Sequence, residues 1–148
     1  MADYATNPRA YHDYEILDTV EAGLVLRGHE AKSVKSGKAN IKGAYVKILN
    51  GEAWLIGAGI APYQAKNMPA DYQEQADRKL LLSRSQLNNL LGLSQSHGVT
   101  LVPLKLYPKR GRVKLLVGVA RGKKKYDKRA ALKKKDTQRA KERGTYDA

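Results

Sequence analysis

The sequence contains no cysteine, no phenylalanine, one tryptophan and only three histidines among its 148 residues. The absence of cysteine excludes disulfides and thiolate metal sites, and it suits a reducing cytoplasm. The histidines His12, His29 and His97 lie too far apart in the sequence to show the spacing of zinc ligands. We therefore expect no metal site, and no motif indicates any other cofactor.

No segment has the features of a signal peptide or a transmembrane helix. The N-terminus carries neither a charged region nor an apolar one, and the longest nearly apolar run, residues 53–62, is much too short to span a bilayer. A length of 148 residues with 42% apolar residues predicts one domain with a core of ordinary size. We expect a cytoplasmic protein that is monomeric in isolation and has no membrane partner.

Motifs for catalysis and nucleotide binding are missing as well. The P-loop pattern does not occur, and Gly57-Ala-Gly59 lies in an apolar stretch without the further glycine and helix of a dinucleotide site. His12 and Asp13 are sequence neighbours, but they cannot form a nucleophilic site without a positioned serine or cysteine. We predict no catalytic residues and no enzymatic activity.

The C-terminal part of the chain is strongly basic. From Arg121 onward it holds twelve Lys or Arg and four acidic residues, so it carries +8 of the net charge of +14. Asp127 can cap a helix that begins at Lys128, but few apolar residues follow that could dock the helix on a core, and its like charges repel. We predict that residues 121–148 form a tail that is disordered alone and orders when a polyanion neutralises it. A solvated solubility tail, or one that binds any nucleic acid, is the alternative.

Alternating apolar residues separated by turn signals predict five strands. The expected strands cover residues 14–26, 41–49, 52–60, 99–107 and 112–119. Ala22-Gly23 interrupts the first strand and predicts a bulge there. Asn50-Gly51 predicts a type I′ turn between the second and third strands, and Pro103 predicts an edge position or a bulge in the fourth.

One helix and one basic loop are expected between these strands. Ser83 and Gln86 form a capping box, which predicts a helix immediately after Ser83. The apolar face of this helix should comprise Leu87, Leu90 and Leu91, and Gly98 should end it. Residues 28–38 are predicted to form a basic loop with room for one helical turn, and residues 1–13 to be irregular.

This order of elements predicts a mainly β fold for residues 1–120, an OB-fold-like closed barrel of five or more antiparallel strands with added helices and a basic C-terminal tail. OB folds bind ligands between the loop that joins strands one and two and the loop that joins strands four and five. Both loops are basic here, the first with Lys32, Lys35 and Lys38 and the second with Lys109, Arg110 and Arg112. Topology and charge therefore select one surface for RNA.

Two aromatic residues of the predicted second and third strands have two interpretations. Tyr45 and Trp54 could offer faces on which RNA bases stack. Because the chain has no phenylalanine, however, Trp54 could instead fill the core, and for this residue a core position is the preferred interpretation.

An ordered set of motifs extends from Asn7 to Arg129. The stretches are Asn7-x-Arg-Ala-x-His-Asp-Tyr14, Glu21-Ala-Gly-Leu24, Gly28-x-Glu-x-Lys-Ser33, Gly37-Lys-Ala-Asn-Ile41, Arg78-Lys-Leu-Leu-Leu82, Leu101-Val-Pro-Leu-Lys-Leu-Tyr107 and Gly122-Lys-Lys-x-Tyr-Asp-Lys-Arg129. Together they resemble the SmpB family, the tmRNA-binding proteins of bacterial trans-translation. The resemblance implies an OB-type barrel, in agreement with the strand order.

The resemblance also implies a function without catalysis. A member of this family binds the tRNA-like domain of tmRNA, substitutes for the missing anticodon arm, and delivers alanyl-tmRNA with elongation factor Tu to stalled ribosomes. Its tail is implied to become helical on the ribosome, where it probes the empty decoding centre and mRNA channel of the small subunit. An occupied channel would exclude the tail, which gives a physical means of sensing a missing message.

By motif, the resemblance assigns eight residues to the tmRNA surface and six to the ribosome-binding tail. The first group comprises Asn7, Arg9, His12, Glu21, Lys32, Ser33, Leu81 and Ser83. The second comprises Gly122, Lys123, Lys124, Asp127, Lys128 and Arg129. In this interpretation Glu21 accepts hydrogen bonds from base or ribose donors, and Leu81 packs under an unstacked base.

Two other classes of function compete with this one. A generic OB-fold ribosomal protein or translation factor would bind RNA with an affinity set by salt and indifferent to Glu21→Ala. An RNA-processing enzyme with an unrecognised site would turn over RNA or nucleotide. Neither class accounts for the ordered set of motifs.

Overall fold

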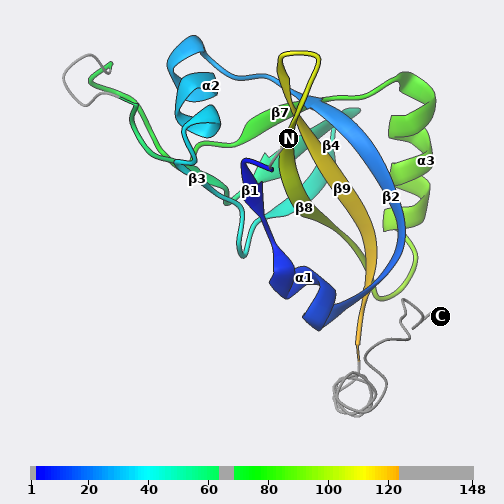
Figure 1. Cartoon of the computed structure of the whole chain (residues 1–148). Helices are drawn as coiled ribbons and strands as arrows, with labels where there is room; N and C mark the ends of the chain where they lie inside the picture. The colour runs from blue at the N-terminus through cyan, green and yellow to red at the C-terminus, as the bar shows by residue number, and fades with distance from the viewer. Residues whose placement is uncertain (1–2, 64–68, 124–148) are drawn as a thin grey trace, which may run out of the picture.

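The computed structural model describes residues 3–63 and 69–123, and nine strands and three helices lie within these ranges (Figure 1). In chain order they are β1 Ala5–Thr6, α1 Pro8–Asp13, β2 Tyr14–Leu24, α2 Gly28–Lys35, β3 Ala39–Asn40, β4 Tyr45–Leu49, β5 Glu52–Ile56, β6 Gly59–Ile60, β7 Arg78–Leu81, α3 Arg84–Ser94, β8 Val99–Lys109 and β9 Arg112–Gly122. The tail predictions for Lys124, Asp127, Lys128 and Arg129 fall outside the described residues.

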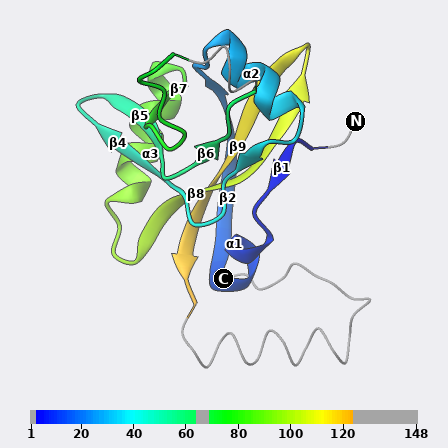
Figure 2. The same ribbon diagram turned by 90° about the vertical axis from the view of Figure 1, so that its left-hand side faces the viewer.

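The strand pairings confirm a mainly β fold built on one large antiparallel sheet. Seven strands pair in the order β1-β8-β4-β5-β7-β2-β9, and β9 also pairs with β8. Strands β8, β4, β5, β7, β2 and β9 are therefore connected in a ring of pairings, while β1 adds to the edge of β8 and β3 pairs only with β6. Figures 1 and 2 show the long strands β2, β8 and β9 side by side, with the three helices at the periphery.

Both predicted hairpins are confirmed. Asn50 and Gly51 have φ values of 52° and 75°, the two positive values that a type I′ turn needs, and they join β4 to β5. Arg110 and Gly111 make the equivalent turn between β8 and β9, with φ values of 52° and 77°. The bulge expected from Pro103 is also present, because the β8–β9 register shifts between Pro103 and Lys105.

The predicted bulge at Ala22-Gly23 is wrong. The register of β2 with β9 shifts instead between Ile16 and Asp18, at the exposed Leu17. Gly23 serves a different purpose, since β2 pairs there with β7 as well as β9, and a Cβ atom on Gly23 would lie 3.2 Å from the Cβ of Leu81. Glycine is thus favoured here by close packing against the neighbouring strand and not by a bulge.

Two predicted strands are shorter than expected. The stretch 41–49 is a strand only over Tyr45–Leu49, after the two-residue β3, and the stretch 52–60 divides into β5 and β6. Gly57 has a φ of 86°, which ends β5 because a pleated strand cannot hold that conformation. The segment around Arg78, for which no strand was predicted, forms β7 and closes the gap between β5 and β2.

The helices partly match the predictions. The capping box at the start of α3 is confirmed, because Ser83 Oγ accepts from the Gln86 N–H and Gln86 Oε1 accepts from the Ser83 N–H. Leu90 is buried as expected, but Leu91 is exposed, and α3 ends at Ser94, before Gly98. Residues 28–38 hold a helix of eight residues, α2, where a loop with at most one turn was predicted.

Helix α1 was not predicted because only one of its six residues, Ala10, is buried. Ala10 packs on Val102, Leu104 and Ala120 in a small cluster at one end of β8 and β9. A larger apolar cluster fills the space between the strands and includes Leu55, Leu101, Leu115 and Val117. In the part of the chain that the structure describes, no helix is both long and apolar enough to cross a membrane.

Candidate nucleic-acid interface

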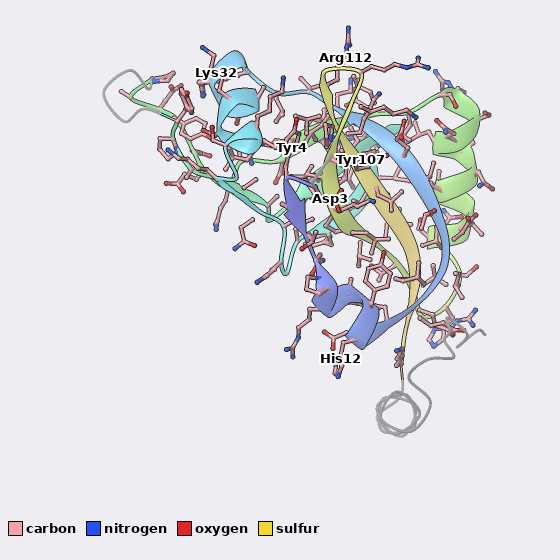
Figure 3. All side chains as sticks on the ribbon, in the orientation of Figure 1. Asp3, Tyr4, His12, Lys32, Tyr107 and Arg112 are labelled. Carbon is pink, nitrogen blue, oxygen red and sulfur yellow. The ribbon has the colours of Figure 1, made fainter. Side chains whose placement is uncertain are left out.

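The two basic segments that the sequence placed at one edge of the fold do lie together. Lys35 Nζ on α2 donates to the carbonyl oxygen of Gly111 in the β8–β9 turn at 3.1 Å. Figure 3 shows Lys32 and Arg112 at the same end of the molecule, on α2 and on this turn. The prediction that topology and charge converge on one edge is confirmed for this pair of segments.

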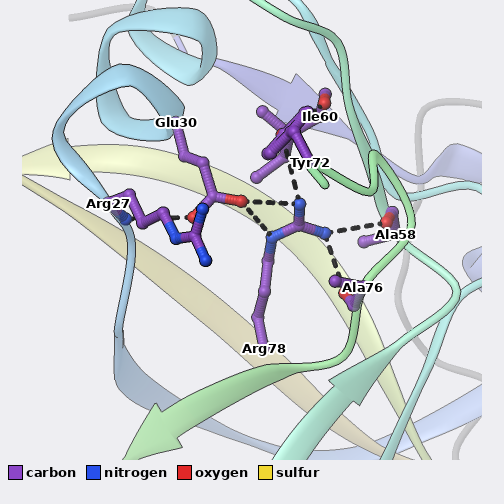
Figure 4. Close-up of polar contacts among 7 residues, drawn as sticks. All are labelled: Arg27, Glu30, Ala58, Ile60, Tyr72, Ala76 and Arg78. Atoms are coloured by element: carbon purple, nitrogen blue, oxygen red, sulfur yellow. Dashed lines mark hydrogen bonds and ion pairs between the residues drawn. The ribbon is translucent and has the colours of Figure 1, made fainter. Parts of the chain in front are cut away.

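A buried ion pair fixes α2 against the strands (Figure 4). Arg78 Nη2 and Nε on β7 donate to Glu30 Oε2 on α2, at 2.8 Å and 3.1 Å. Arg78 Nη1 donates to the carbonyl oxygens of Ala58 and Ala76, and Glu30 Oε1 accepts from the backbone N–H of Arg27. Both charges are therefore paired and hydrogen-bonded, the condition under which buried charges are tolerated.

The pKa of Glu30 is lower than its ordinary value, although its surroundings act on it in opposite directions. Burial acts to raise this pKa, but the hydrogen bond from the Arg27 N–H and the hydrogen bonds and charge of Arg78 outweigh it. A carboxyl whose pKa is lower in the folded than in the unfolded state stabilises the fold above the unfolded pKa. This stabilisation is lost as the pH falls through the folded pKa, and so the ion pair should weaken only in acid.

We therefore expect the difference in the free energy of unfolding between the wild type and an Arg78→Met variant to become smaller as the pH falls. Below the ordinary pKa of 4.5 the wild type loses the ion-pair contribution. In the variant, burial without Arg78 would raise the pKa of Glu30, so protonation would relieve an unpaired charge. Urea unfolding of both proteins from pH 7 to pH 3.5 measures the effect, and a constant or growing difference in acid would contradict it.

Glu21 lies on β2 within a cluster of polar side chains from β8. The Tyr107 hydroxyl donates to Glu21 Oε1 at 2.5 Å, and Lys109 Nζ donates to both carboxylate oxygens, at 3.2 Å and 3.1 Å. The hydrogen bond from Tyr107, followed by that from Lys109, lowers the pKa of Glu21, while burial and the bond to Glu21 raise the pKa of Tyr107. Glu21 is thus an ionised, oriented acceptor at the surface.

Leu81 lies on the same side of the sheet as Glu21. It pairs with Gly23, which is two residues from Glu21 and so points to the same face of β2. Its side chain is 53% exposed and lies over Gly23, in the space that a side chain at position 23 would need. Ser83 follows two residues later as the N-cap of α3. The structure thus brings Glu21, Leu81 and Ser83 to neighbouring positions.

Arg9 and His12 lie elsewhere, on α1. Figure 3 shows His12 at the end of the molecule opposite to Lys32 and Arg112. Arg9 Nε and His12 Nδ1 both contact the carboxylate of Asp13, at 3.4 Å and 3.0 Å. The backbone N–H of Lys123 donates to the Asp13 carbonyl, and Lys123 Nζ donates to the Tyr11 carbonyl. These predicted tmRNA residues therefore lie beside the start of the tail and not beside Glu21.

Asn7 and Ser33 of the predicted group are buried. Asn7 Nδ2 donates to the carbonyl oxygen of Pro103, the residue at the bulge of β8, so its side chain supports the irregular strand. Ser33 has no exposed surface, and its hydroxyl has no hydrogen-bond partner among the described residues. In this conformation neither side chain can reach a bound RNA.

Trp54 does not lie in the core, which corrects the preferred interpretation of its sequence. Its strand neighbours Ala53 and Leu55 are buried, so the alternation of β5 directs Trp54 to the outer face, where it is half-buried. Tyr45 on β4 is exposed and points to the same face.

Sequence reasoning missed the partners of Glu21 and of Glu30. Tyr107 alternates with Lys105 and Lys109 along β8, which places all three on one face, but no sequence signal indicates that this face meets Glu21. Arg78 opens a matched motif and yet shows no sign of burial in the sequence. In the described ranges no group of three or more His, Cys, Asp and Glu side chains could hold a metal ion.

Comparisons with known proteins place these features in a family. The family model described as SmpB protein matches residues 4–147. SsrA-binding proteins from Rubrobacter xylanophilus and Enterococcus faecalis are 49% and 50% identical to this chain, over 97% and 91% of it and 95% and 87% of their own lengths. A chain from the structure described as "tmRNA-SmpB: a journey to the center of the bacterial ribosome" shares 47% identity and a TM-score of 0.67, over 91% of this chain and 94% of that one.

Proposed function

The chain belongs to the SmpB protein family, and from this premise we propose that it binds tmRNA and acts in trans-translation, the rescue of stalled ribosomes. The names of its relatives and the tmRNA complex of its structural neighbour support this function. The partner is the tRNA-like domain of tmRNA, for which the protein supplies a substitute anticodon arm. The protein works in the cytoplasm as a monomer and without catalysis.

The observation that carries this proposal is Glu21. An acidic side chain costs affinity at an RNA surface unless it makes hydrogen bonds, because it repels phosphates. Tyr107 and Lys109 hold Glu21 in place beside the basic edge, and an ionised carboxylate can accept further hydrogen bonds from base or ribose groups. A carboxylate held in one orientation accepts hydrogen bonds only from donors in matching positions, so it can distinguish one RNA from another. A surface that is only basic binds any phosphate backbone.

The remaining surface has complementary parts. Lys32 on α2 and the cations of the β8–β9 turn contact phosphates, while Leu81 packs under an unstacked base. Ser83 adds a hydroxyl, and Asn7 and Ser33 act through the fold, since both are buried. We interpret the ring of paired strands as an OB-type barrel.

The second surface faces the ribosome. Arg9 and His12 contact the side chain of Asp13, and the Asp13 carbonyl accepts from the N–H of Lys123, where the last strand has ended and the tail begins. The tail, with Lys124, Asp127, Lys128 and Arg129, enters the vacant decoding centre and mRNA channel of the small subunit and becomes helical there. The barrel meanwhile retains alanyl-tmRNA, which elongation factor Tu accompanies.

Glu21→Ala is expected to weaken binding to the tRNA-like domain of tmRNA about tenfold or more, as the loss of hydrogen bonds to a charged group predicts. Removing a negative charge by itself raises the affinity for any polyanion, so a fall in affinity would show that the hydrogen bonds of Glu21 matter more than its charge. Equilibrium binding at near-physiological salt measures the change, with an unrelated folded RNA of equal length as the competitor.

Asp18→Ala is the matched control, because Asp18 is an exposed acid on the same strand and bonds only to the N–H of Thr19 among the described residues. It should leave the affinity for the tRNA-like domain unchanged or slightly higher. If the wild type instead binds both RNAs equally and Glu21→Ala changes neither affinity, the protein is a generic OB-fold RNA-binding protein.

A further inference from the structure

The outer face of β4, β5 and β7 carries a concentration of exposed apolar and aromatic side chains. Among the large hydrophobic residues that are exposed in the described ranges, Tyr45, Leu49, Leu81 and Val25 all border this face. The helices pack mainly elsewhere, α1 on β2 and β8, α2 on β6 and β9, and α3 on β8 and β9. Figure 2 shows the β4–β5 hairpin and β7 together at one side of the molecule.

The strand registers give this face a definite order. Lys47 on β4 pairs with Trp54 on β5, and Trp54 pairs with Lys79 on β7, so the only tryptophan of the chain lies between two lysines. Tyr45 pairs with Ile56 and is therefore the diagonal neighbour of Trp54 on the same face. Diagonal neighbours on an antiparallel pair are about 7–8 Å apart, which is within reach of aromatic side chains.

The charges on this face favour a polyanion as its occupant. Lysine is depleted at the centres of protein–protein interfaces, yet Lys47 lies directly beside Trp54 and is exposed. The acid of these strands, Glu52, is held by Lys79 at 2.7 Å, so Lys47 is left to contact an incoming anion. Two aromatic rings beside the exposed Lys47 suit successive unpaired bases, because bases stack on aromatic rings and a lysine meets their phosphates.

We propose that this face, centred on Tyr45, Lys47 and Trp54, binds an unpaired segment of RNA whose bases stack on the two aromatic rings. The proposal rests on the proposed function in so far as the protein must meet RNA. It adds a second RNA contact, on β4 and β5. In the order of paired strands, β7 with Leu81 lies between these two strands and β2, which carries Glu21. The unpaired segment can belong to tmRNA or to ribosomal RNA, since both supply the same chemistry.

Trp54 provides the readout, because it is the only tryptophan and a stacked base quenches its fluorescence. Titration of the full-length protein with an eight-nucleotide single-stranded RNA should quench Trp54 emission saturably. Tyr45→Ala should weaken the RNA affinity measured by this quenching at least fivefold, as the loss of one stacking ring predicts, and Lys47→Ala should also weaken it. Lys42→Ala is the matched control, since Lys42 is exposed in the turn before β4 and outside this face.

The same titration with the tRNA-like domain of tmRNA and with small ribosomal subunits distinguishes the sources of the segment. In one outcome the tRNA-like domain binds specifically, but none of the three probes changes Trp54 emission and Tyr45→Ala binds each probe as tightly as the wild type. This inference then fails and the proposed function stands. If the tRNA-like domain shows no specific binding but the short RNA still quenches Trp54, the proposed function fails and this face remains an RNA site. A protein that self-associates through Tyr45 in sedimentation, without quenching by RNA, would also overturn the inference.

Discussion

Arg78→Met is expected to lower the free energy of unfolding by about 3–5 kcal/mol, the cost of removing one partner from a buried ion pair. The substitution leaves the carboxylate of Glu30 buried without its cation, and it takes a donor from the carbonyls of Ala58 and Ala76. A domain of this size has a total stability of about 5–15 kcal/mol, so the loss is a large share of it. Chemical unfolding followed by circular dichroism measures the change.

The next residue on the same strand supplies a matched control. Lys79 also pairs with a glutamate, Glu52, at 2.7 Å, but the two side chains are 41% and 44% exposed. Exposed ion pairs contribute about 0–1 kcal/mol, so Lys79→Met should cost little. Equal losses from the two substitutions would show that the Glu30–Arg78 pair does not fix α2 as the structure suggests.

A double variant separates the ion pair from the packing of its side chains. In Glu30→Gln with Arg78→Met, no charge is left buried, so part of the stability lost in Arg78→Met should return. The position of α2 also bears on function, because this helix carries Lys32 and holds Lys35 against the β8–β9 turn. We therefore expect Arg78→Met to weaken RNA binding through a displaced α2, although Arg78 itself is buried.

Sequence patterns predicted the features that depend on local rules. The type I′ turn at Asn50-Gly51, the bulge at Pro103 and the capping box at Ser83 each follow from the backbone preferences of a few residues, and each is present. The basic segments that meet at Gly111 followed from strand order combined with charge.

The features that sequence patterns missed depend on contacts between distant segments. Gly23 looked like a bulge, but its lack of a side chain is explained only by Leu81 on another strand. Trp54 was placed in the core because tryptophan is usually buried, whereas the register of β5 directs it outward. Helix α1 buries one alanine, too weak a signal for periodicity to detect.

Prediction of the candidate site was limited in the same way, because the site also depends on contacts between distant segments. Family resemblance supplied Glu21 and Leu81 as candidates, but residues assigned together from motifs lie at opposite ends of the molecule, Lys32 at one and His12 at the other. The hydrogen bonds of Tyr107 and Lys109 to Glu21 join residues 86 and 88 positions apart in sequence. Only the pairing of β2 with β9, and of β9 with β8, brings them together.

Deleting residues 124–148 should abolish tagging of stalled ribosomes while the protein still binds the tRNA-like domain. The cut belongs after Lys123 and not after Ala120, because β9 continues to Gly122 and the Lys123 N–H donates to the Asp13 carbonyl. Binding of the tRNA-like domain should weaken by less than about tenfold, since the phosphate contacts that we propose for α2 and the β8–β9 turn would remain. A reconstituted translation reaction on a message without a stop codon measures the tagging.

The deleted segment carries a net charge of +6, so generic attraction to ribosomal RNA must be separated from a specific fit. A full-length variant with these 25 residues in scrambled order keeps the charge and the composition but removes the spacing of Lys124, Asp127 and Arg129. If the tail must enter the decoding centre and mRNA channel as a helix, the scrambled variant should bind ribosomes and yet fail to support tagging. Full tagging by this variant would show that the tail acts only as an electrostatic tether. Recognition of the empty channel would then belong to the residues before Lys124.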